Sequence, residues 1–118
     1  MNFWSYCWDV TPVEQKALYH AWCVMGGNFV TLLTTQMIQK LGELQIPAQA
    51  LQLYSEKIIE NAYKAPQTAL TGPLARKDAV TVSANLTALA RDPAQKIYQT
   101  FLEIHWPEYL AQQRGDHE

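Results

Sequence analysis

The feature that most limits what this chain can fold into is the stretch Ala17–Gln39, which contains no Asp, Glu, Lys or Arg. About 20 apolar residues suffice to cross a bilayer, so the stretch is long enough to do so. It also carries His20, Asn28 and several Thr and Gln residues, which are costly in lipid. We therefore expect no membrane span here, but a helix that protein covers on most sides.

The sequence predicts that this stretch belongs to one long helix from about Pro12 to about Gln45. Thr11 suits the N-cap, Pro12 the first helical position, and Glu14 completes a capping box. Gly26–Gly27 lies near the middle of the helix. Each glycine weakens a helix by roughly 1 kcal/mol relative to alanine, so the pair predicts a kink or the close approach of another backbone.

A rotation of roughly 100° per residue assigns two faces to the long helix. One face is apolar and is formed by Leu18, Trp22, Met25, Phe29, Leu32 and Leu33. The nearly opposite face is small and polar and is formed by His20, Val24, Gly27, Thr31, Thr34 and Thr35, with Asn28 at its edge. Since a solvated face normally carries Lys and Glu, we expect this uncharged polar face to meet protein or a ligand cleft.

Turn signals divide the rest of the chain into shorter helices. A second helix is predicted over Ala48–Tyr63, followed by a short helical turn and a tight loop between Pro66 and Pro73. A third helix is predicted from a cap at Asp78 to about Leu89. Its Val80–Val82 segment also permits a strand, but the apolar spacing favours a helix.

The signature Asp92–Gln95 repeats the pattern of cap, proline and glutamine and predicts the start of the last helix. Pro107 is expected to end or kink this helix. Residues 1–10 are expected to form an N-terminal extension, and residues 112–118 a frayed polar tail. The fold class predicted for residues 1–118 is all-α, a single domain with a bundle of four or five helices around the long one.

Composition excludes several classes of protein. With 118 residues, of which 48% are hydrophobic, the chain can build one core. A net charge of -2 gives no reason to expect nucleic acid or an anionic membrane as a partner. The two cysteines, Cys7 and Cys23, make no disulfide framework, and Cys23 is interpreted as a small buried apolar residue. A cytoplasmic location follows, because no signal peptide of the usual layout is present.

No dinucleotide fingerprint or phosphate loop is present, so the chain alone is expected to bind no nucleotide cofactor. His20 and Cys23 are close in sequence and on neighbouring turns, but no further ligand or orienting group is evident, so we expect no metal. His20 with Asn28 is a more informative pair, because a carbonyl or hydroxyl substrate needs a proton donor and an orienting amide. The alternative is a buried His and Asn that neighbouring helices satisfy.

The segment Leu70–Asp78 concentrates special residues. A glycine, a proline, a hydroxyl and a guanidinium lie close together in it and could hold an anionic substrate group or a cofactor phosphate. An interhelical turn with a helix cap at Asp78 explains the same residues equally well. Both interpretations stay open at the level of sequence.

Taken together, these residues resemble a known pattern: Tyr19–His20, Asn28–Phe29, and Leu70–Arg76 followed by Asp78, Val82 and Leu86. The pattern is similar to the C-terminal domain, itself of unknown function, of a bacterial family of Rossmann-like oxidoreductases. That family is related to pyrroline-5-carboxylate reductase, ketopantoate reductase and the 6-phosphogluconate dehydrogenase group. The resemblance covers about residues 13–109.

The resemblance implies a 6-phosphogluconate dehydrogenase C-terminal-like bundle that dimerises through its long helix. It implies a cleft between this bundle and a Rossmann domain, which is absent from this chain and would be supplied in cis or in trans. The complete enzyme would use NAD or NADP, and the isolated chain would be inactive. By the same resemblance, His20 and Asn28 would be catalytic, and the substrate- or cofactor-binding residues would be Thr71, Gly72, Pro73, Arg76 and Asp78.

This chain departs from the family pattern at two places. Lys77 stands where the family usually has glycine, which is expected to alter the cap of the third helix, and Met25–Gly27 fits the family's small residues only loosely. Because the Rossmann half is missing, the alternative function is a stand-alone helical module for self-association or small-ligand binding, without enzymatic activity.

Overall fold

The computed structural model describes residues 9–116, which form helices and turns and contain no strand. This confirms the all-α class. Most of the predicted N-terminal extension, residues 1–8, lies outside the described residues. The chain divides into two compact units, Met1–Ser55 and Glu56–Glu118. Helix α4 (Ala48–Lys64) begins in the first unit and ends in the second, and its bounds match the predicted second helix.

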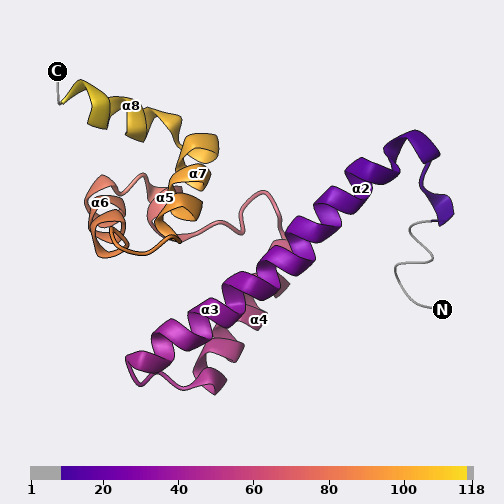
Figure 1. Ribbon diagram of the computed structural model, residues 1–118, viewed down its shortest axis with the longest axis horizontal. Helices are drawn as coiled ribbons and strands as arrows, with labels where there is room; N and C mark the ends of the chain where they lie inside the picture. Colours follow the sequence, from indigo (N-terminus) through magenta and orange to yellow (C-terminus); the bar gives the residue numbers. More distant parts are fainter. Residues whose placement is uncertain (1–8, 117–118) are drawn as a thin grey trace. The chain divides into compact units, whose positions relative to one another are not determined.

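One uninterrupted helical run dominates the first unit (Figure 1). It confirms the predicted long helix, starting and ending slightly inside the expected bounds. The run consists of a 3₁₀ turn η1 (Val13–Gln15), α2 (Lys16–Cys23), a π-helical turn η2 (Val24–Phe29) and α3 (Val30–Glu43).

The glycine pair lies inside the π turn, so it changes the register of the helix without breaking it. Neither glycine has a positive φ, and a Cβ added at Gly26 or Gly27 would meet nothing within 4 Å. The hydroxyl of Thr31 donates to the Gly27 carbonyl oxygen at 3.0 Å. Backbone strain and crowding within the first unit therefore leave these glycines unexplained.

The π turn corrects the predicted faces. A π turn closes i→i+5 bonds and so holds one residue more than an α turn, which rotates everything beyond it by roughly 100°. Val30 then joins the apolar face and Leu32 leaves it. Asn28 comes to within roughly 20° of His20 around the axis, where a regular helix would separate the two by roughly 80°. The constant rotation assumed from sequence is wrong across this turn.

A Schellman motif ends α3. The amide of Ile46 donates to the Leu41 carbonyl at 3.0 Å, and that of Gln45 to the Gly42 carbonyl at 2.9 Å. Gln45 has φ 65°, the left-handed conformation that the motif requires and that glycine usually supplies. The chain turns here and enters α4, whose Leu51 is buried.

The second unit is built from four shorter helices after the second half of α4. They are α5 (Gly72–Arg76), α6 (Ala79–Ala88), α7 (Gln95–His105) and α8 (Pro107–Gly115). The strand alternative for Val80–Val82 is wrong, because these residues lie in α6. Regular structure reaches further into the polar tail than the sequence predicts, since α8 continues to Gly115.

The core of the second unit is a cluster of Val82, Leu102, Trp106 and Tyr109, of which the most exposed member, Trp106, is only 7% exposed. Two polar contacts join α6 to α7: the Asn85 amide donates to the Tyr98 hydroxyl at 3.0 Å, and the Gln95 amide to the Leu86 carbonyl at 2.8 Å. The α7 helix begins at Gln95 rather than Pro93, because the Asp92 carboxylate accepts from the Ala94 amide in a turn that precedes it.

Candidate functional site

The Leu70–Asp78 segment folds into a corner between two helices. Gly72 has φ 81°, which a residue with a Cβ rarely adopts, and Pro73 occupies the first turn of α5. A second Schellman motif then ends α5, with the Asp78 amide donating to the Pro73 carbonyl at 2.9 Å. The turn interpretation thus accounts for Gly72, Pro73 and Asp78.

Asp78 also starts the next helix, as predicted. Its carboxylate accepts from the Thr81 hydroxyl at 2.7 Å and from the Thr81 amide at 3.1 Å. The hydrogen bond from the Thr81 hydroxyl is the largest of the effects that lower the pKa of Asp78 below its ordinary value. The Asp78 carboxylate therefore stays ionised as the N-cap of α6.

Arg76 and Thr71 are the two residues of this corner that its backbone geometry does not require. The Arg76 guanidinium lies 3.6 Å from the Asp78 carboxylate, and its side chain is 63% exposed. Thr71 is exposed and makes no side-chain cap to α5. These two side chains keep donors that an anionic group could use.

Lys77 shows why the resembling family has glycine at this position. Lys77 has φ 56° at the C-terminal end of α5, in the left-handed conformation. Its ammonium lies 5.1 Å from the centre of the Trp106 ring and donates to the His105 carbonyl at 3.5 Å. The contact with the ring offsets part of the cost of a non-glycine residue in this conformation.

Two substitutions of Lys77 separate the ring contact from the backbone cost. Lys77→Ala loses the contact and keeps the left-handed backbone, so its unfolding midpoint in urea should fall. Lys77→Gly also loses the ring contact, but glycine adopts the left-handed conformation without the steric cost. The glycine variant should therefore be about 1 kcal/mol more stable than Lys77→Ala. Urea denaturation followed by circular dichroism gives the comparison. An alanine variant at least as stable as the glycine variant would contradict a left-handed residue 77.

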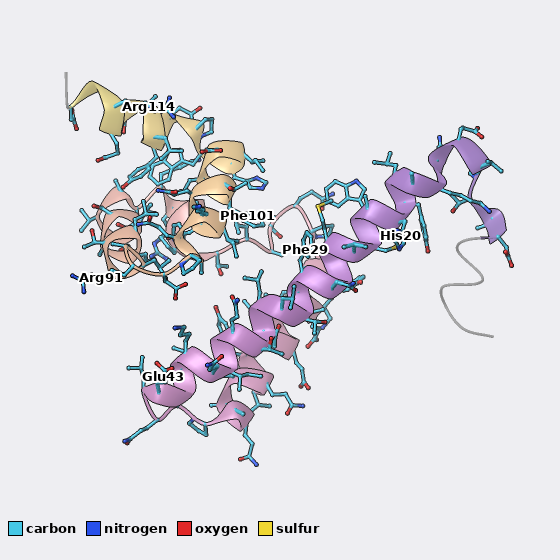
Figure 2. The ribbon with its side chains drawn as sticks, in the orientation of Figure 1. His20, Phe29, Glu43, Arg91, Phe101 and Arg114 are labelled. Carbon is cyan, nitrogen blue, oxygen red and sulfur yellow. The ribbon has the colours of Figure 1, made fainter. Side chains whose placement is uncertain are left out.

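In the first unit, His20 lies on the long helix (Figure 2), and His20 and Asn28 are both exposed. No neighbouring helix among the described residues of this unit buries the pair. At roughly 1.5 Å per residue they are roughly 12 Å apart along the axis, and the π turn places them on one side of it. Such a row can contact two polar groups of one small molecule.

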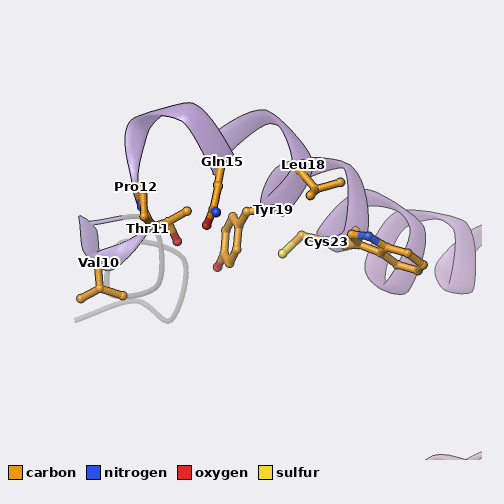
Figure 3. A pocket seen from close by; sticks show the side chains of 8 residues that line it. Val10, Thr11, Pro12, Gln15, Leu18, Tyr19 and Cys23 are labelled. Atoms are coloured by element: carbon orange, nitrogen blue, oxygen red, sulfur yellow. The ribbon is translucent and has the colours of Figure 1, made fainter.

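A separate hollow lies beside the start of the long helix and was not predicted from sequence (Figure 3). Its volume is about 550 Å³, within the range of small-molecule pockets. Leu18 and Trp22 give it apolar walls, and Tyr19 and Cys23 face into it. Cys23 is half-buried, not fully buried as predicted. His20 and Asn28 do not line this hollow.

The predicted site residues thus lie in two separate groups. The first unit holds His20 and Asn28, and the second unit holds Thr71, Gly72, Pro73, Arg76 and Asp78. Among residues 9–116, no group of three His, Cys, Asp or Glu side chains could hold a metal ion. Within the same residues, no helix combines the length and apolar character needed to cross a membrane.

The fold and these two groups define an all-helical domain with a corner motif and a long helix that has no charged residue from Ala17 to Gln39. Residues 5–103 match one family, a domain of unknown function (DUF2520). The chain belongs to this family, which covers most of its length. No curated protein and no solved structure matches the chain.

Proposed function

We propose that this chain is the dimerisation and substrate-cleft domain of an NAD(P)-dependent oxidoreductase, and that it is not catalytic alone. The comparison with Rossmann-like reductases rests on the residue pattern of the sequence, and the matched family is one of unknown function. The observation that carries the proposal is the long helix, whose apolar side chains are exposed although no charged residue occurs from Ala17 to Gln39. Such a surface is typical of an interface or a cleft wall.

The helix offers a different chemistry on each side. Leu18, Trp22 and Leu33 are between 41% and 65% exposed, and they suit contact with protein. On the opposite side, His20 would donate a proton to the carbonyl oxygen of a substrate as it is reduced, and Asn28 would orient the substrate through a second polar group. Arg76, in the second unit, would bind an anionic group of the substrate or cofactor.

The residues of this chain do not fit a dinucleotide site. Residues 9–116 contain no strand, and the sequence has no glycine-rich turn of the type that holds a pyrophosphate. NAD or NADP would therefore be bound by a Rossmann domain in cis or in trans. This chain would contribute side chains to the substrate and an interface to its partner.

The catalytic part of the proposal is tested with His20→Ala in the chain combined with its Rossmann domain. Loss of the proton donor should lower kcat for carbonyl reduction by about 10²-fold and leave KM nearly unchanged. Gln36→Ala, an exposed polar change on the same helix, is the control and should leave kcat unchanged. An unaltered kcat in the His20→Ala protein would remove His20 from the chemistry.

A further inference from the structure

The two glycines at the centre of the long helix need an explanation outside the first unit. Glycine is among the poorest helix formers, and neither Gly26 nor Gly27 has a positive φ that would require it. A Cβ at either position would meet only open space. Within the first unit, then, alanine would serve better at both positions.

The position of Gly26 indicates what the glycine accommodates. Because π geometry turns less per residue, Gly26 lies on the apolar face between Trp22 and Val30. It also lies near the middle of the helical run, which begins at Val13 and ends at Glu43. Exposed apolar side chains flank it on both sides, at Leu18 and Trp22 before it and at Val30 and Leu33 after it.

We infer that the occupant of this face is a second copy of the chain, and that the two long helices cross at Gly26 about a twofold axis. This inference rests on the proposed dimerisation function and adds the contact point. In a twofold pair, residues at the axis meet their own copies, so a missing side chain there lets the backbones approach closely. A crossing near the middle lets both arms of each helix bury apolar residues.

The surface available suits such a pair. Six exposed apolar side chains lie on or beside this face: Leu18, Trp22, Met25, Phe29, Val30 and Leu33. If a partner covers roughly 100 Å² of each side chain, about 600 Å² of solvent-accessible surface is buried per copy. This is close to the about 800 Å² per partner that a standard interface buries. The absence of charge from Ala17 to Gln39 means that no Lys or Glu must be desolvated when two copies meet.

Disulfide trapping in the full chain tests the crossing point. In a background with Cys7→Ser and Cys23→Ser, Gly26→Cys should form a covalent dimer under mild oxidation, because the two copies of residue 26 would lie within disulfide range. Gly42→Cys is the matched control, since Gly42 is also a helical glycine in open space. It lies roughly 24 Å further along the axis and should stay monomeric on a non-reducing gel.

A bulky substitution gives a second measurement that does not depend on oxidation. Gly26→Leu should raise the dimer dissociation constant at least tenfold without lowering the thermal midpoint of the isolated chain, whereas Gly42→Leu should leave the dissociation constant unchanged. If the wild-type chain is a dimer but Gly26→Cys does not cross-link and Gly26→Leu does not weaken it, the crossing point is wrong and the dimerisation proposal stands. If the wild-type chain is a monomer, the crossing point and the dimerisation proposal are both wrong.

Discussion

Leu102→Ala is expected to destabilise the second unit by about 3–5 kcal/mol, a large effect for a single truncation. Leu102 has no exposed surface and packs in the cluster with Val82, Trp106 and Tyr109. Deleting its methyl groups removes their burial and leaves a cavity that the surrounding helices only partly fill. Because domains of this size are stable by only about 5–15 kcal/mol, a large fraction of the stability would be lost.

The measurement is urea denaturation followed by circular dichroism and Trp fluorescence. Ile104→Ala is the matched control, since Ile104 lies on the same helix but is 65% exposed, and it should change the unfolding free energy by no more than about 0.5 kcal/mol. Equal losses in the two variants would contradict the core as described.

Trp22→Lys is expected to weaken self-association by about 10³-fold or more. Trp22 is the largest side chain on the exposed apolar face, and it is 65% exposed in the single chain. In a twofold pair the substitution acts in both copies, and each copy loses an aromatic contact and gains a charge to desolvate. Folding of the single chain should change little, because the side chain contributes little to burial within it.

Gln39→Lys provides the control with the same charge on the opposite side of the helix, beyond the π turn. It should leave the dimer dissociation constant within about threefold of wild type, an effect typical of a charge at the rim. Sedimentation velocity over a concentration series measures both variants. A Trp22→Lys protein that associates as tightly as wild type would exclude this face as the interface.

Helix starts and stops were predictable because they depend on local chemistry. The Asp78 cap and the break at Pro107 each follow from hydrogen bonds or steric limits within one turn of chain. The long helix starts one residue after the predicted position, but the predicted capping box is wrong, because Pro12 is the N-cap residue and no side chain caps this turn. The all-α class followed from the apolar spacing between these signals. None of these features depends on contacts between distant segments.

The π turn could not be predicted in the same way. The sequence marks Gly26–Gly27 as a weak point, but a kink, a close approach and a change of helix type all satisfy that signal. The faces beyond the glycines were therefore assigned one residue out of register. The alignment of Asn28 with His20 and the place of Val30 on the apolar face emerge only from the three-dimensional structure.

The candidate site was predicted in part. The residues of the Leu70–Asp78 segment were singled out correctly as special, but most of them serve the corner between α5 and α6. The left-handed end of α5 was not predicted, because residue 77 is a lysine and not the glycine that usually indicates such a helix end. The hollow beside Tyr19 and Cys23 had no sequence signal, since its wall combines residues that would serve equally well in a helix core.

The measurement that tests the central claim most directly is the solution mass of the purified chain, determined by light scattering across a dilution series. The account predicts a mass near twice 13.4 kDa that falls toward 13.4 kDa on dilution. A helical, folded chain whose mass stays at 13.4 kDa at every concentration would contradict the assignment of the apolar face of the long helix to self-association.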